Sequence, residues 1–414
     1  MKKGTIFILC ILFLIPFSNV AAQTLSLSVQ DAIKYCLERH PDMGLSQEKV
    51  TAARAHVWHA WAPENPHLRW GYKGAPEDGS FSAAVEKSFG IVQKIDFPTN
   101  WVLHGKLASA DLYSEKLSLK LTRINLTAKV RKAYWTLITA RAELDLAEQA
   151  QGLAEDFLQK AKRRYEVGET TNLEFIKAKV EKARAENLRT QLENNERISL
   201  AELNNLLNRD INAQILTTDS LKYEPLTIDL EEAQEQALKI HPKLQMSTQS
   251  IKTAQLNRTL AWGSFLPSIE IGYFQQTLNG NPEFRGAEIG LSIPLWFLFN
   301  QRAKIQAASA RIREMEFSFR SRTNDIILQV KTAYENTKTA ETHLQLFQKN
   351  LLTEAEEVYR IAKISYDEGE SSYLELLDAQ RTFIDVKREY IQFLLLYQNS
   401  LTELEHAIGF NLET

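Results

Sequence analysis

Residue types that perform catalysis or bind metals are present in this 414-residue sequence, but they are scattered. His56 and His59 are three apart and could form half of a metal site on a helix, yet no third ligand lies nearby in the sequence. There is no nucleophile elbow, no phosphate-binding glycine loop and no basic cluster suited to nucleic acid. The sequence therefore predicts a protein that is not an enzyme, with no cofactor, no resident metal and no nucleic-acid partner.

A second group of polar residues forms a turn that occurs twice, at 165–174 and 366–375, 201 residues apart. In each copy a glycine, Gly168 or Gly369, is followed by short polar residues and lies between two long helical stretches. Glycine takes the left-handed conformation that ends many helices without a Cβ clash. Each turn is therefore predicted to be the tip of a helical hairpin, and the following residues are candidate caps of the returning helix: Thr171 or Asn172, and Ser371 or Ser372.

The N-terminal residues 1–22 have the pattern of a secretory signal peptide. Two lysines precede a 12-residue apolar run, which is too short to span a membrane, and small residues follow at 20–22. Cleavage leaves Cys36 as the single cysteine, so no intramolecular disulfide is expected. The sequence thus predicts an exported protein without a transmembrane helix.

Much of the chain is duplicated at the same offset of 201 residues as the two turns. Residues 31–41 match 232–242, and Trp61 matches Trp262. Self-similarity of this kind indicates two tandem structural repeats. We place the first repeat at 23–210, a linker at 211–225 and the second repeat at 226–414.

Each repeat contains a segment in which apolar residues alternate with other residues, which is typical of strands with one apolar face. Examples are Leu68, Trp70 and Tyr72 in the first repeat and Ile269, Ile271 and Tyr273 in the second. The connecting segments, around 74–80 and 279–286, are rich in Gly, Pro and Asn. The sequence predicts one β-hairpin per repeat, at about 67–97 and 267–295, hence four strands per chain.

Long helices are predicted where proline is absent, at 99–224 and 295–414. A helix over 99–166 would be roughly 100 Å long, with a return helix at about 172–208 and a shorter helix at 43–62 that could extend it end to end. Small and large residues alternate at spacings of three and four, as in coiled coils, at these positions: 133, 137, 140, 144, 147, 151, 154, 158, 161 and 165, then 340, 344, 347, 351, 355, 358, 362 and 366.

Four strands with an outward apolar face make an unsatisfactory open sheet. In lipid, unpaired strand edges are excluded and only a closed barrel removes them. Single-chain outer-membrane barrels begin at about eight strands. Four strands are therefore expected to close only by sharing a barrel with other copies of the chain, which would gather the long helices into a tube.

Along almost its whole mature length, the chain resembles the TolC-like outer-membrane efflux proteins. The features that carry the resemblance are the tandem repeat, Asn65-Pro66 before the first strand, Pro98 and Pro294 where strand returns to helix, and the twin turns. The resemblance implies a mainly α fold with a small β part. Long antiparallel helical hairpins would form an α-barrel tunnel, and four strands per chain would contribute to a trimeric 12-stranded transmembrane β-barrel.

The resemblance also implies function. A passive channel in the outer membrane would connect the periplasm with the exterior, and its helical tunnel would dock to a periplasmic adaptor protein that leads to an inner-membrane pump. In the family, acidic residues on the return helices form rings at the periplasmic mouth. By position these are Glu174, Glu375 and Asp378, and three copies of each would favour cations. A solvated helix start is the alternative role for them.

The tip residues Tyr165, Gly168, Tyr366 and Gly369 match the expected adaptor contact, although the glycines could simply end helices and the tyrosines could simply pack. The well-known members latch the closed mouth with an arginine where this chain has Ser371, so that latch is not carried over. A soluble periplasmic coiled-coil adaptor or scaffold is the alternative function. The alternating strand segments favour the channel, and the sequence does not name the transported substance, the pump or the adaptor.

Overall fold

The computed structural model describes residues 25–75, 77, 83–278, 281–293 and 299–409. The predicted signal peptide, residues 1–22, and Pro294 lie outside these ranges. The elements are β1 (Leu25–Leu27), α1 (Val29–Arg39), α2 (Pro41–Ala60), β2 (His67–Lys73), β3 (Glu86–Ile95), α3 (Pro98–Glu166), α4 (Asn172–Leu206), β4 (Ile215–Thr217), α5 (Leu230–Ile240), α6 (Pro242–Gly263), β5 (Ser268–Leu278), β6 (Asn281–Ser292), α7 (Asn300–Leu346), a π-helical turn (Phe347–Leu351), α8 (Leu352–Asp367) and α9 (Tyr373–Ile408).

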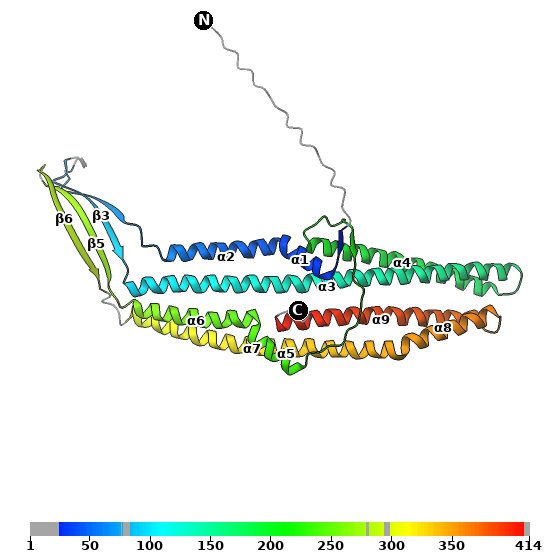
Figure 1. Ribbon diagram of the computed structural model, residues 1–414. Helices are drawn as coiled ribbons and strands as arrows, with labels where there is room; N and C mark the ends of the chain where they lie inside the picture. Colours follow the sequence, from blue (N-terminus) through cyan, green and yellow to red (C-terminus); the bar gives the residue numbers. More distant parts are fainter. Residues whose placement is uncertain (1–24, 76, 78–82, 279–280, 294–298, 410–414) are drawn as a thin grey trace, which may run out of the picture.

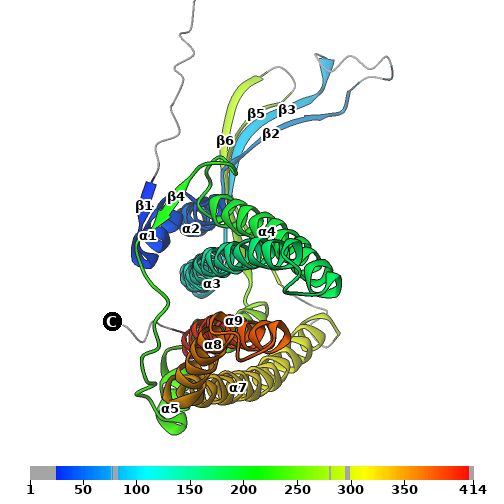
Figure 2. The same cartoon turned by 90° about the vertical axis from the view of Figure 1, so that its right-hand side faces the viewer.

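The molecule is elongated, with a β-sheet at one end and two helical hairpin tips at the other (Figure 1). Seen along its length, the helices of the first repeat lie on one side and those of the second repeat on the other (Figure 2). In each repeat one long rod is covered by two shorter helices in line. α2 and α4 lie along α3, and α6 and α9 lie along α7 (Figure 1). The end-to-end arrangement predicted for the shorter helices is confirmed.

The rod α3 is 69 residues long and begins at Pro98, one residue before the predicted start at 99. Toward the tip, its buried face includes alanines that recur every seven residues, at Ala140, Ala147, Ala154 and Ala161. Side chains this small allow neighbouring helices to approach closely, and a seven-residue repeat keeps the same face toward a partner helix. The stripe of small residues therefore allows close packing of helices on the part of α3 between residues 140 and 161.

The second rod differs from the first by the π-helical turn between α7 and α8. Ala133 matches Ala333 at an offset of 200, whereas Ala154 matches the buried Ala355 at an offset of 201, so the second rod has gained one residue between these points. A π-turn places one additional residue in a helix without breaking it. It therefore absorbs the insertion and keeps the apolar face of α8 in line with that of α7.

Buried polar contacts fix the middle of the molecule, where the two repeats meet. The side chain of Arg131 on α3 donates to Glu405 on α9, and both side chains are almost fully buried. The linker is attached to the first repeat: Asp219 accepts hydrogen bonds from the Tyr134 hydroxyl at 2.9 Å and from the Val29 N–H at 2.7 Å. Since these groups are withdrawn from water, removing one partner would leave the other uncompensated.

A four-stranded antiparallel sheet has the order β2-β3-β5-β6, so the two predicted hairpins join through β3 and β5. Residues paired across strands share a face, and one face of the sheet is mainly apolar. It carries the pairs Leu68–Ile91, Trp70–Phe89, Ile91–Tyr273 and Ile271–Ile289, and these side chains are exposed. The opposite face carries small and charged residues, including an Arg69–Glu288 ion pair at 3.6 Å. The period-two prediction is confirmed.

Two details of the strands were not predicted correctly. β6 begins at Asn281, inside the segment 279–286 that was expected to be a connection, because Gly and Asn mark turns more reliably than they mark a turn's length. Two further strands, β1 and β4, pair in parallel near the middle of the molecule. At three residues each they are too short to show an alternating pattern. Among the described residues, no helix is both long and apolar enough to cross a membrane.

The π-turn predicts an asymmetry between the two rods. Deleting Lys349 should convert the turn to regular α-helix with little change in stability, because the buried faces of α7 and α8 would still be directed at the same neighbouring helices. Deleting Gln151 from α3 should rotate the helix beyond it by about 100° and expose Ala154, Phe157 and Ala161. We expect a loss of more than about 4 kcal/mol for this control deletion, measured by denaturant unfolding. Equal losses for the two deletions would show that the turn does not absorb the insertion.

His241 predicts a loss of stability at acid pH. It is buried at the N-cap of α6, where its Nδ1 accepts a hydrogen bond from the Lys243 N–H at 3.1 Å. Burial lowers its pKa to about 4, with Lys243 and His406 adding to the effect. Its contribution is thus complete above pH 6.5 and is lost as pH falls from 6.5 toward 4, by about 3 kcal/mol.

The variant His241→Asn keeps an acceptor at the cap and removes the titrating ring, so the unfolding free energy should depend less on pH between 6.5 and 4. The matched control is His40→Asn, since His40 makes the same cap to the Asp42 N–H in the first repeat but is not buried. The pH dependence should fall more in His241→Asn than in this control. If the pH dependence of the unfolding free energy is unchanged in His241→Asn, His241 is not the cause of the loss of stability at acid pH.

Candidate functional site

The two hairpin tips have nearly identical backbone geometry. Gly168 and Gly369 have φ of +80° and +81°, the left-handed conformation expected from the sequence. The N–H of Glu169 donates to the Arg164 carbonyl and that of Glu370 to the Ser365 carbonyl, both at 2.8 Å. These bonds satisfy carbonyls that a helix end would otherwise leave unpaired. The glycines therefore end α3 and α8 as predicted.

The caps of the return helices are now defined. Thr171 accepts from the N–H of Glu174 on α4, and Ser372 accepts from the N–H of Glu375 on α9, each at 3.4 Å. An added Cβ at Gly168 or Gly369 would meet no heavy atom within 4 Å. The outer surface of both tips is consequently open to the close approach of another molecule.

The predicted acidic residues have different environments. Glu174 accepts hydrogen bonds from Thr170 at 2.5 Å and from the Tyr366 hydroxyl of the other hairpin at 3.4 Å. Glu375 completes a capping box by accepting from the Ser372 N–H at 3.2 Å, and its side chain remains exposed. Asp378, one turn further along α9, is exposed. Glu174 thus joins two hairpins, whereas Glu375 and Asp378 lie on the surface of one.

The two tip tyrosines also differ. Tyr366 is buried, and besides contacting Glu174 it lies under the Arg164 guanidinium, which is 5.4 Å from the ring centroid. Burial raises the pKa of Tyr366, and hydrogen bonding to Arg164 opposes the shift. Tyr165 is exposed and stacks on Phe175 within its own hairpin. Only Tyr366 is therefore placed to connect the hairpins.

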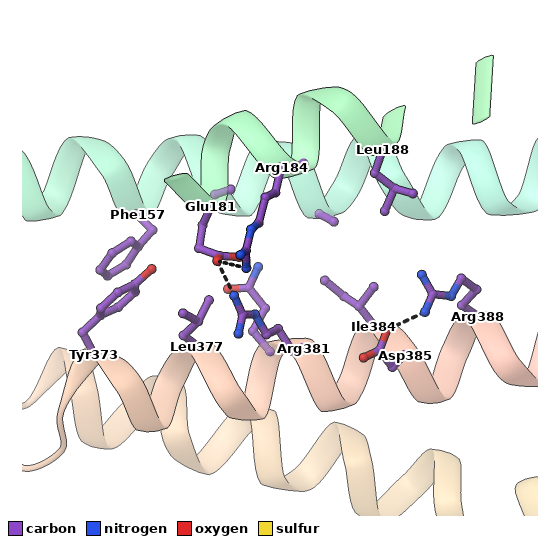
Figure 3. A pocket seen from close by; sticks show the side chains of 14 residues that line it. Phe157, Glu181, Arg184, Leu188, Tyr373, Leu377, Arg381, Ile384, Asp385 and Arg388 are labelled. Atoms are coloured by element: carbon purple, nitrogen blue, oxygen red, sulfur yellow. Dashed lines mark hydrogen bonds and ion pairs between the residues drawn. The ribbon is translucent and has the colours of Figure 1, made fainter. Parts of the chain in front are cut away.

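Ion pairs that were not predicted also cross between the hairpins. Arg381 on α9 donates to Glu181 on α4, and Lys160 on α3 lies 3.7 Å from Asp367 on α8. Figure 3 shows Arg381 and Arg184 meeting Glu181 from opposite hairpins. When the two repeats are aligned, Glu181 corresponds to residue 382, so its position is one away from that of Arg381. The ion pair between Glu181 and Arg381 can be predicted from the sequence only if the two return helices are already known to lie side by side.

These residues form a set that we call the cross-hairpin contacts: Lys160–Asp367, Arg164–Tyr366, Glu174–Tyr366 and Glu181–Arg381. Each links the first hairpin to the second near the tips. Ser371, at the position of the family arginine, is half-buried, and its hydroxyl has no hydrogen-bond partner among the described residues. The hairpins are thus held together here both by charged side chains on the helix faces and by a buried cluster of Phe157, Ala161, Ala178, Tyr366, Tyr373 and Leu376.

His56 and His59 lie near the opposite end of the molecule, with ring centroids 6.0 Å apart in an edge-on arrangement. Within the ranges that the structure describes, no three or more His, Cys, Asp or Glu side chains are grouped so that they could hold a metal ion. The histidine pair therefore contributes to an aromatic contact at the end of α2.

Comparisons with known proteins agree with this architecture. Curated relatives include the probable efflux pump outer membrane protein TtgC of Pseudomonas putida, 24% identical over 321 residues. The match covers 72% of this chain and 63% of the relative, which is less than two thirds of the relative's length. The cobalt-zinc-cadmium resistance protein CzcC of Cupriavidus metallidurans is 21% identical over 292 residues, 69% of this chain and 68% of the relative.

Solved structures share the fold at low identity. The structure of CusC aligns with a TM-score of 0.79 at 17% identity and covers 96% of both chains. The Campylobacter jejuni CmeC outer membrane channel aligns with a TM-score of 0.78 at 14% identity, covering 92% of this chain and 85% of that one.

A family model described as outer membrane efflux protein matches the chain twice, over residues 32–209 and 233–410. The two matches fall on the two halves that carry the twin hairpins and the twin strand pairs. Because they account for most of the sequence, the chain belongs to the outer membrane efflux protein family.

Proposed function

We propose that three copies of this chain form a passive channel in the outer membrane and that the hairpin tips form its periplasmic mouth. The single observation that carries the proposal is the sheet, which has one mainly apolar face and whose edge strands, β2 and β6, pair with no further strand in the described part of the chain. In lipid such edges must be paired. Pairing β2 of one copy with β6 of the next gives 12 strands for three copies, the number that the family resemblance implies.

The helices support the same ring. Exposed apolar residues lie along α4 at Leu173, Ile176 and Val180, with spacings of three and four. A second exposed series lies along the π-turn and α8, at Leu351, Val358 and Ile361. Spacings of this kind form the seam between packed helices. Since α4 and α8 belong to different hairpins, packing α4 of one copy on α8 of the next would close a tunnel of helices.

Family membership supports a role in efflux, with an adaptor and an inner-membrane pump as partners. The curated names of the relatives refer to unlike substances, including toluene for a TtgC protein and cobalt, zinc and cadmium for CzcC. The proposal therefore leaves substrate choice to the pump. In the trimer, Glu375 and Asp378 of three copies would surround the mouth and attract cations.

The cross-hairpin contacts predict a gate. Arg381→Gln should weaken the closed arrangement, so that the purified trimer in a planar lipid bilayer conducts at least several-fold more current than wild type. The control is Arg388→Gln, because Arg388 pairs with Asp385 on its own helix at 2.8 Å and crosses no hairpin boundary. This control should conduct like wild type. A wild-type protein that forms no detergent-stable trimer and no pore would overturn the proposed channel, and equal conductance in both variants would overturn the gate.

The open tip glycines predict a docking surface. Gly369→Trp should abolish export while leaving the trimer intact, because the side chain fills the space through which an adaptor would approach. Gly369→Ala is the control, since it carries the same strain at positive φ, about 1 kcal/mol, without the bulk. Export should be measured in cells together with trimer abundance in outer-membrane fractions. Full export by Gly369→Trp would exclude docking at this tip.

A further inference from the structure

A large apolar side chain, Phe274, lies on the polar face of the sheet. Strand pairing places Phe274 of β5 in one row with Gly90 of β3 and Gly286 of β6, and Arg69 of β2 is at the end of this row. Exposed apolar side chains such as Tyr273 lie on the opposite face. The alternation of apolar and polar residues along the strands therefore does not account for Phe274.

The ring of Phe274 lies along the wall of the sheet. A Cβ atom added to Gly286 would be only 2.4 Å from the Cζ atom of Phe274 and 2.9 Å from both of its Cε atoms. Cβ atoms in proteins essentially never come this close to other atoms. The far end of the ring thus covers the backbone of β6, and it can lie there because residue 286 is glycine.

The space on the other side of Phe274 is already occupied. Arg69 on β2 reaches Glu288 on β6, with 3.6 Å between the guanidinium and the carboxylate. Because β3 and β5 separate these two strands, the two side chains together cross the inner strands. Glu288 covers β5, since a Cβ added to Gly272 would be 3.4 Å from the Glu288 Cγ, so Arg69 must span β3. A ring displaced from Gly286 would therefore turn away from the wall.

We infer that Phe274 sets the width of the channel at this row, and that Gly286 keeps the lumen open by allowing the ring to lie flat. The inference rests on the proposed channel, in which the apolar face of the sheet meets lipid and the polar face lines the lumen. Three copies of the chain place three such rings at one level of the barrel. Because pore diameter limits which solutes pass, this row selects solutes by size.

The test measures how fast reagents of graded size enter the lumen from outside intact cells. Cysteine replaces Glu270, which lies on the same face as Phe274 and four residues nearer the helices. A reagent must therefore pass the row to reach it. The probes are polyethylene-glycol maleimides of increasing mass, and labelling is followed as a mass shift on gels after unreacted reagent is quenched. The natural Cys36 is buried and is protected from labelling in the folded protein.

Gly286→Ala should slow the labelling of Glu270→Cys by the larger maleimides about tenfold, because the displaced rings narrow the lumen. The smallest maleimide should still react. Gly272→Ala is the matched control, since its added Cβ makes an ordinary contact with Glu288 and displaces no ring. It should be labelled like the parent protein. Adding Phe274→Ala to Gly286→Ala should restore the parental rate, because no ring remains to be displaced.

A second reporter, Gln276→Cys, lies on the outer side of the row and should be labelled at the same rate in every variant. The inference is overturned if Gly286→Ala is labelled by the larger maleimides at the parental rate, if Gly272→Ala slows them equally, or if Phe274→Ala fails to restore the rate.

Two further outcomes have a definite meaning. If Gly286→Ala forms no trimers, Phe274→Ala alone decides: removing the rings should speed the entry of the largest maleimides, and a parental rate would overturn the inference. If a parent protein that forms trimers is labelled at neither reporter, the polar face lines no lumen. That result would overturn the proposed channel itself, and it differs from every result that overturns only the role of Phe274.

Discussion

The structure depends on a constraint of length: both hairpin tips must end at the same level. The first rod uses 69 residues between the sheet and its tip. The second uses α7, the π-turn and α8, which comprise 47, 5 and 16 residues. The rods thus match to within one residue, about 1.5 Å of helix, and their tips lie level (Figure 1). The cross-hairpin contacts require this match, because side chains of fixed reach must meet across the gap.

Equal length alone would not align the faces of the helices. A residue inserted into a regular helix rotates everything beyond it by about 100°, which would turn Tyr366 and Ala355 away from the first hairpin. The π-turn removes this rotation, so Tyr366 still meets Glu174. The tips then combine a well-defined backbone with contacts based on charge. Surface pairs of this kind are individually weak, so each adds little to the free energy that holds the two hairpins together.

Features that depend on a short stretch of sequence could be predicted, and features that depend on contacts between two distant segments could not. The glycines of the turns, the strands around Trp70 and Tyr273 and the proline-free rods follow from local rules. The Glu181–Arg381 pair does not, because its partners are 200 residues apart and neither belongs to a motif. Tyr366 was correctly placed at a tip, but its contact with Glu174 required the packing of the hairpins. The π-turn could not be recognised in the sequence, because a pattern of apolar residues spaced three and four apart still looks helical when one residue is inserted.

The buried pair between Arg131 and Glu405 has a consequence for ancestry. Tandem repeats arise when a single-copy gene is duplicated and fused, and a single-copy ancestor would have assembled from twice as many separate subunits. In the present chain each repeat holds one member of this charge pair. A substitution that removes one of these two charges would leave the other buried without its partner charge, at a cost of several kcal/mol. The fusion therefore allowed the two repeats to diverge into complementary halves, since each now carries a different member of one buried charge pair.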